Sequence, residues 1–134
     1  MQALLDTDTC IELIRTRNPA ILERLQQHSP GDVAISSITL AELEFGVSKS
    51  AQPAKNRAAL DLFLTPLELA PFDQAAARAY GDIRATLERK GSRIGPLDTL
   101  IGAHALSLGV TLVTHNTREF SRIPTLRLAD WTAH

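Results

Sequence analysis

Short apolar runs alternate with helical segments along this chain, and this alternation restricts the possible folds more than any other feature. Five runs are short enough to be strands, at residues 2–6, 33–36, 67–72, 110–116 and 126–131. Segments with helical spacing of apolar residues separate them, at 7–15, 19–29, 38–50, 53–64, 74–90 and 97–108. This order favours an α/β fold with a short, mostly parallel central sheet flanked by helices on both faces.

Residues with known positional preferences mark the expected helix ends. Pro19 and Pro53 suit the first position of a helix, because the N–H that proline lacks has no partner there. Ser37 is the expected N-cap of the helix at 38–50, and Asp73 introduces the long helix that Gly91 ends.

The composition is that of one globular domain spanning residues 1–134. The chain is 44% hydrophobic and 22% charged, and it has no repeat, linker or low-complexity tract. A net charge of −1 gives no sign of a nucleic-acid ligand, although local basic patches remain compatible with one. The single Cys10 cannot form an internal disulfide, and Asp98 and His104 interrupt the longest apolar stretch. We therefore expect a cytoplasmic protein with no membrane span.

Asp6 directly follows the first predicted strand. Open α/β sheets bind ligands at the carboxyl ends of their strands, so this carboxylate is a candidate site residue. An aspartate between a strand and a helix also serves as a cap or turn former, and Asp8 is equally placed to be the cap.

Glu42 lies on a helix that is apolar nearly all round. Ile38, Ala41 and Phe45 are expected on its face. A charge there costs several kcal/mol unless a cation or hydrogen-bond donors compensate it, and a salt bridge would serve as well as a metal. Glu44, about 200° away round the helix, is expected to point to solvent.

Asp98 lies near the start of the segment GPLDTLIGAHALSLG and is expected on the same helix face as Ile101, Gly102 and Ala105. The two small residues allow another group to approach the backbone closely. An acid at this position is also favoured by the positive end of the helix dipole, which is the alternative explanation.

An α/β sheet can bring Asp6, Glu42 and Asp98 together at one edge. Three such carboxylates would repel one another unless a divalent ion neutralised them, and oxygen ligands suit Mg2+ or Mn2+. We therefore predict a metal site formed by these three acids. Asn116 or Glu119 could complete it through a water, although the segment HNTRE also suits a turn and a helix start.

Several basic residues are candidates for holding a nucleic acid. They form clusters on or beside predicted loops: Arg15 and Arg17; Lys49, with Lys55 and Arg57; and Arg89, Lys90 and Arg93. Each is also compatible with an ordinary solvated surface. No histidine pair has metal-binding spacing, so His28, His104, His115 and His134 are unassigned, with His104 expected at a helix surface or an interface.

The chain resembles the PIN-domain ribonucleases, and within them the VapC toxins of bacterial toxin–antitoxin pairs. The resemblance rests on LLDTDTCIELI, ISSITLAELEFGV, GPLDTLIGAHAL and LVTHNTREFSRIPTLRLADW, in the family's order and spacing. It implies a PIN fold in which Asp6, Glu42 and Asp98 are the acidic metal ligands and Thr7 and Thr114 orient groups around them.

The resemblance also implies an activity and partners. The expected activity is Mg2+-dependent hydrolysis of an RNA phosphodiester, which leaves a 5′-phosphate and a 3′-hydroxyl. Asn116 with Glu119 resembles a VapC branch that cleaves initiator tRNA in the anticodon loop. The expected partners are a VapB-like antitoxin and a second copy of the toxin.

Two departures from the family pattern keep other functions open. Asp8 stands where Asn is common, and LLDTDT also resembles the Asp-x-Asp opening of haloacid-dehalogenase phosphatases, in which the first Asp attacks phosphate. Asn116 stands where many PIN domains carry a fourth acid, which puts a second metal in doubt and favours a non-catalytic binding scaffold as a further alternative.

Overall fold

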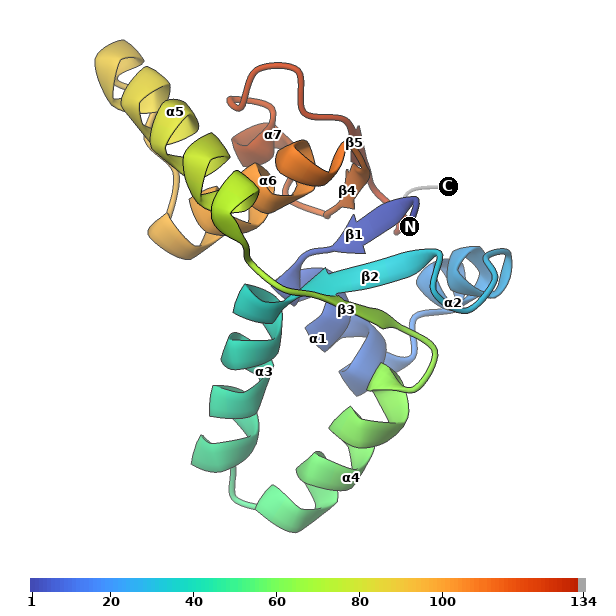
Figure 1. The fold of residues 1–134 in the computed structure, drawn as a ribbon. Coiled ribbons are helices and arrows are strands. Elements are labelled where there is room, and N and C mark those ends of the chain that lie inside the picture. Colours follow the sequence, from blue (N-terminus) through green and yellow to red (C-terminus); the bar gives the residue numbers. More distant parts are fainter. Residues whose placement is uncertain (133–134) are drawn as a thin grey trace.

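The computed structural model describes residues 1–132, and its core is a five-stranded sheet (Figure 1). All neighbouring strands are parallel, in the order β3-β2-β1-β4-β5. The strands are β1 Ala3–Leu5, β2 Val33–Ser36, β3 Glu68–Ala70, β4 Thr111–Val113 and β5 Leu128–Ala129. The helices are α1 Thr7–Thr16, α2 Pro19–Gln26, α3 Ser37–Lys49, α4 Pro53–Leu64, α5 Gln74–Lys90, α6 Pro96–Leu108 and α7 Thr117–Phe120.

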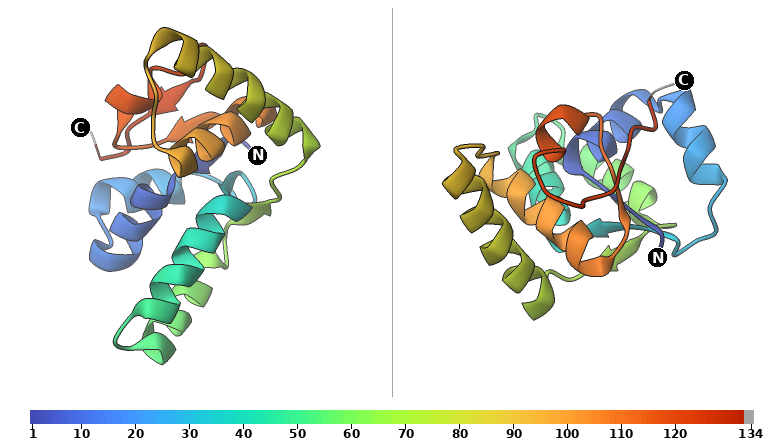
Figure 2. Two further views of the ribbon diagram at one scale, coloured as in Figure 1. Left: turned by 90° about the vertical axis from the view of Figure 1, so that its left-hand side faces the viewer. Right: turned by 90° about the horizontal axis from the view of Figure 1, so that it is seen from above.

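Helices cover both faces of this sheet, as the alternation of apolar runs predicts. Helices α1 to α4 lie on one face and α5 to α7 on the other (Figures 1 and 2). Successive strand residues serve the two layers in turn: Ala3 and Leu5 pack against α1 to α4, and Leu4 packs on the side of α5 and α6. The predicted fold class is confirmed.

The parallel order brings the ends of several elements to one edge of the sheet. Helices α1 and α3 leave the carboxyl ends of β1 and β2. Helix α6 leads into the first residue of β4, so it runs opposite to the strands and its own first turn lies at the same carboxyl edge. Asp6 and Asp98, which are 92 residues apart in the sequence, are placed at this edge by topology alone.

Two expectations about polar residues are wrong. Ser36, not Ser37, is the N-cap of α3: its backbone is still extended, and its Oγ accepts from the N–H of Ile38. Ser37 Oγ instead accepts from the N–H of Phe72 at 2.9 Å. His104 is fully buried rather than at a surface, because α6 is covered by both the sheet and α5, and its Nδ1 lies 2.8 Å from Ser36 Oγ.

Element ends differ modestly from the expected ones. The runs at 110–116 and 126–131 form only the short β4 and β5, and α2 ends at Gln26. Within residues 1–132, no helix is both long and apolar enough to cross a membrane. Residues 133 and 134 of the predicted domain, and with them the unassigned His134, lie outside the described residues.

Candidate active site at the carboxyl edge of the sheet

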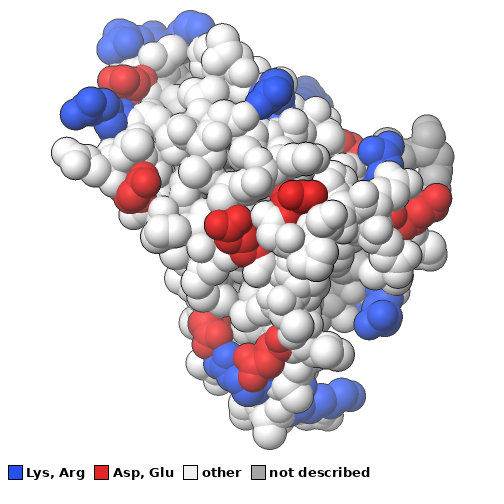
Figure 3. Space-filling model, turned by 45° about the vertical axis from the view of Figure 1, so that its right-hand side comes forward, with Lys and Arg blue, Asp and Glu red and all other residues white. Residues whose placement is uncertain are grey.

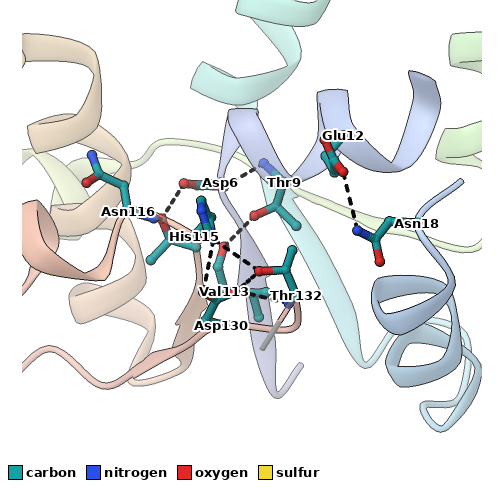
Figure 4. A network of polar contacts seen from close by, with 10 residues as sticks. Asp6, Thr9, Glu12, Asn18, Val113, His115, Asn116, Asp130 and Thr132 are labelled. Carbon is teal, nitrogen blue, oxygen red and sulfur yellow. Dashed lines mark hydrogen bonds and ion pairs between the residues drawn. The ribbon is translucent and has the colours of Figure 1, made fainter. Parts of the chain in front are cut away.

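Asp6 is held by hydrogen bonds to both of its carboxylate oxygens. Its Oδ1 accepts from the N–H of Thr9 at 2.8 Å, which makes Asp6 the N-cap of α1, and its Oδ2 accepts from the Thr114 hydroxyl at 2.6 Å (Figure 4). Burial raises the pKa of Asp6, while the bonds from Thr114 and Thr9 oppose that rise. Asp6, not Asp8, is therefore the helix cap, and the cap function fixes its orientation at the site.

Glu42 is fixed by two threonines. The Thr7 hydroxyl donates to Glu42 Oε1 at 2.6 Å and lies 3.1 Å from the Thr39 hydroxyl. Because Thr7 has one hydroxyl proton, Thr39 is the donor to Thr7 in the second bond. Thr39 is fully buried. These hydrogen bonds orient Glu42, and no cation lies within salt-bridge distance of it among the described residues.

The surroundings of Glu42 differ from the expected ones in two ways. The apolar surface of helix α3 is not buried all round, because Ala41 and Phe45 are exposed, Phe45 at 64%. Glu44 does not simply face solvent: both its oxygens accept from Arg57 of α4 at 2.6 Å, which lowers the pKa of Glu44. The spacing of apolar residues within α3 does not reveal that α4, which carries Arg57, packs beside it.

Among the acids at this edge, Asp98 has the largest shift in pKa. Burial raises its pKa to about 6, and the negative charges of Glu119, Asp6, Asp8 and Glu42 add to the effect. The structure therefore brings the three predicted ligands into one electrostatic cluster, with Glu119 and the exposed Asp8 beside them.

Glu119 ties α7 to the start of α6. Its Oε1 accepts from the N–H of Gly95 at 3.1 Å, and its Oε2 accepts from the Asn116 amide at 2.9 Å. These bonds lower the pKa of Glu119, the bond from Asn116 most. The Asn116 N–H in turn donates to Thr114 Oγ1 at 2.9 Å, so these side chains form one network that reaches Asp6. Asn116 also begins α7, as the turn-and-helix alternative predicts.

The small residues beside Asp98 serve packing. A side-chain carbon on Gly102 would collide with Ile123, and it would also lie 3.4 Å from Phe120. The group that approaches the α6 backbone closely is therefore the protein's own chain after α7, and this contact seats the helix that carries Asp98.

The acidic cluster is not a preformed metal cage. Within residues 1–132, no three His, Cys, Asp or Glu side chains are close enough together to hold an ion as they stand. Acidic side chains lie at the middle of the face shown in Figure 3, and both acidic and basic side chains lie toward its upper and lower ends. A groove of about 950 Å³ is lined by Asp8 and Glu42 and also by Arg15 and Lys49, two of the predicted RNA-binding residues.

The other predicted RNA-binding residues lie at two further places. Arg17 borders a separate cavity of about 350 Å³ between α1, α2 and α4. Arg89 and Lys90 are exposed on the last turn of α5, and Arg93 lines a small pocket between α5 and the chain that enters α6.

Sequence reasoning missed Thr39 and Gly95 at this site. Thr39 precedes Glu42 by three residues on the same helix, and this spacing was an available signal. Gly95 acts through its backbone N–H, for which the sequence holds no signal.

Known proteins resemble this chain over nearly its whole length. The family model described as "PIN domain" matches residues 3–126. A tRNA(fMet)-specific endonuclease VapC from Salmonella typhimurium is 44% identical over 98% of both chains. One of the same description from Shigella flexneri is 41% identical over 98% of this chain and 99% of its own length.

Solved structures give the same result. DNA-bound VapBC from Salmonella typhimurium contains a chain with a TM-score of 0.94 and 44% identity, covering 98% of both chains. VapBC2 from Rickettsia felis, bound to a DNA fragment from its promoter, contains one with a TM-score of 0.92 and 41% identity, covering 98% of this chain and 99% of that one.

Proposed function

Because this chain belongs to the PIN-domain family and to its VapC ribonucleases, we propose that it is an endoribonuclease toxin that hydrolyses RNA at the Asp6, Glu42 and Asp98 cluster. The observation that supports this most is the electrostatic state of Asp98. Its pKa is raised to about 6 at the carboxyl edge of the sheet, where other acids surround it. A chain gains nothing in stability from such repulsion, and active sites are where it is commonly found.

The cluster fits a divalent cation in its chemistry. Its donors are carboxylate oxygens, which Mg2+ and Mn2+ prefer, and none of Asp6, Glu42 and Asp98 has a cationic partner within residues 1–132. We propose that these three side chains hold the ion. When bound, a divalent ion supplies Lewis acidity and lowers the pKa of a coordinated water.

The surrounding residues hold the carboxylates in place. Thr7 donates to Glu42 and Thr114 donates to Asp6, each at 2.6 Å, which supports the site-orienting roles that the family resemblance implies for these threonines. Asn116 and Glu119 belong to the proposed site as the pair that links Asp6's network to Gly95. Glu119 accepts from the N–H of Gly95 directly before α6, so we assign Glu119 to positioning α6.

The substrate and partners follow from the relatives. Two of them are described as tRNA(fMet)-specific endonucleases, and we propose the same RNA for this chain, cut in its anticodon loop. Similar chains are found in VapBC complexes, so we propose that a VapB-like antitoxin neutralises the toxin. A toxin homodimer and a cytoplasmic location remain predictions.

A cleavage assay tests this function. The purified chain is incubated with tRNA(fMet) and Mg2+, with and without EDTA, beside Asp98→Asn and Asp8→Asn variants. We expect cutting that needs Mg2+, leaves a 5′-phosphate and a 3′-hydroxyl, and is lost in Asp98→Asn but retained in Asp8→Asn.

Two other outcomes would support the alternative functions. RNA binding without cleavage at any Mg2+ concentration would favour a scaffold, for which Asn116 in place of a fourth acid is the one specific feature. Phosphatase activity that is lost in Asp8→Asn would favour the dehalogenase-like chemistry.

A further inference from the structure

We infer that a pocket between α5 and the start of α6 binds one nucleotide of the RNA strand, next to the acidic cluster. This inference rests on the proposed ribonuclease function and adds a binding subsite to it. The pocket has a volume of about 250 Å³. Its apolar lining includes Leu87, Ile94 and Pro96, and Arg84 and Arg93 are its basic residues.

The pocket lies beside the proposed catalytic centre. Pro96 and Thr99 line it, and both belong to the first turn of α6, which also carries Asp98. Arg122 connects the two places: its Nη1 donates to the carbonyl of Arg93 at 3.0 Å, and its charge lowers the pKa of Glu119. Arg122 therefore lies near both the acidic cluster and Arg93 of the pocket.

The two arginines that line the pocket differ in how they are held. Arg84 Nη1 donates to the Tyr80 hydroxyl at 3.0 Å, and its guanidinium lies 6.0 Å from the centre of the Tyr80 ring. Its Nε is 3.5 Å from Glu88. Arg93 is exposed, and no carboxylate lies within salt-bridge distance of it in the described part of the chain.

This arrangement suits an unpaired nucleotide. Bases splayed out of single-stranded RNA stack on aromatic rings and on guanidinium planes, and phosphates pair with arginine. Arg84, already oriented by Tyr80, offers a plane beside an apolar surface, and Arg93 offers a free charge for the adjoining phosphate. A guanidinium plane for a base and a second arginine for its phosphate favour RNA, so we assign the pocket to RNA and not to the antitoxin.

Variants of the full chain test the assignment. Arg93→Gln and Arg84→Gln remove the proposed phosphate and base contacts, and Glu88→Gln removes the carboxylate that competes for Arg84. Arg78→Gln is the matched control, because Arg78 is exposed on the same helix but does not line the pocket. The probe is a fluorescein-labelled RNA stem-loop with the anticodon loop of tRNA(fMet), and its binding in EDTA and its cleavage in Mg2+ are both measured at several salt concentrations.

We expect Arg93→Gln to raise both Kd and KM about 10-fold with kcat unchanged, since a hydrogen bond to a charged group is lost. The slope of log K against log salt should become shallower by about 0.7, the value for one phosphate contact on a single strand. Arg84→Gln should weaken binding with a smaller change in slope, and Glu88→Gln should tighten it.

The RNA-binding measurement tests the pocket whether or not the chain is a ribonuclease. A chain that binds the stem-loop but never cleaves it contradicts the ribonuclease function, and its variants still test the pocket. If Arg93→Gln and Arg84→Gln bind RNA no more weakly than Arg78→Gln, the pocket is not an RNA subsite. Weakened antitoxin binding by these two variants, with RNA binding unchanged, would show that a protein partner occupies it instead.

Discussion

At the scale of the residue, Asp98 combines a proposed function with a cost in stability. Folding raises its pKa from the ordinary 3.8 to about 6 through burial and neighbouring acids. The folded chain therefore binds more protons than the unfolded chain between these two pH values. Stability is lost as pH rises through this window, and the full penalty is present above about pH 6.

Asp98→Asn should stabilise the metal-free chain. The increase in the free energy of unfolding should be present above about pH 6 and should disappear as the pH falls toward 4, since protonated Asp98 carries no charge to remove. Urea unfolding in EDTA across this pH range measures it. Mg2+ should stabilise the wild type and not the variant; a variant no more stable than wild type above pH 6 would contradict the assigned repulsion.

Replacing the threonine that contacts Glu42 directly should lower kcat more than replacing the one behind it. Thr7→Val removes the donor at 2.6 Å from Glu42 and should lower kcat about 10-fold, as expected for a lost hydrogen bond to a charged group. Thr39→Val removes only the bond behind Thr7 and should have a smaller effect on kcat. Steady-state cleavage kinetics compare them. A larger loss of kcat in Thr39→Val than in Thr7→Val would contradict this order.

At the scale of the element, the packing of α6 fixes where Asp98 lies. Gly102→Ala places a methyl group against Ile123 and Phe120, both fully buried, and should destabilise the chain by about 1 to 3 kcal/mol through overpacking. Gly81→Ala is the matched control on α5, where no atom lies within 4 Å, and it should stabilise by up to about 1 kcal/mol. Thermal unfolding of both variants measures the difference. Equal stabilisation by the two would contradict the close contact.

Element types were predictable from the sequence, whereas their exact ends and surroundings were not. Pro53 fixes its own backbone angle φ, and Gly91 can adopt the left-handed conformation that ends a helix; α4 begins at Pro53, and α5 ends directly before Gly91. Ser36 and Ser37 have the same side chain, so only the backbone conformation decides which one caps α3. The residue type of Phe45 does not reveal whether its side chain faces the core or the solvent. Its exposure depends on where α4 packs.

At the scale of the whole molecule, parallel strand order explains how much of the site was predictable. Strand ends converge at one edge, so Asp6 and Asp98 could be placed together from topology. The bond between Thr7 and Thr39 crosses 32 residues and depends on how α1 packs on α3, which no local pattern encodes. The burial of His104 likewise depends on distant parts of the chain, since its ring contacts Ser36 of β2 and Phe72.

The charge layout of the molecule supports one account of its function. An acidic centre lies at the edge of the sheet, where Asp6, Glu42 and Asp98 have no salt-bridge partner among residues 1–132, and arginines lie beyond it. Such a centre attracts a divalent ion, and the arginines attract the phosphates of RNA. The central claim is that Asp6, Glu42 and Asp98 hold that ion together.

Crystals soaked in Mn2+ test this claim most directly. We predict an anomalous peak bound by the Asp6, Glu42 and Asp98 carboxylates, and its loss in crystals of Asp98→Asn. Wild-type crystals in which these carboxylates face apart, with no anomalous peak among them, would contradict it.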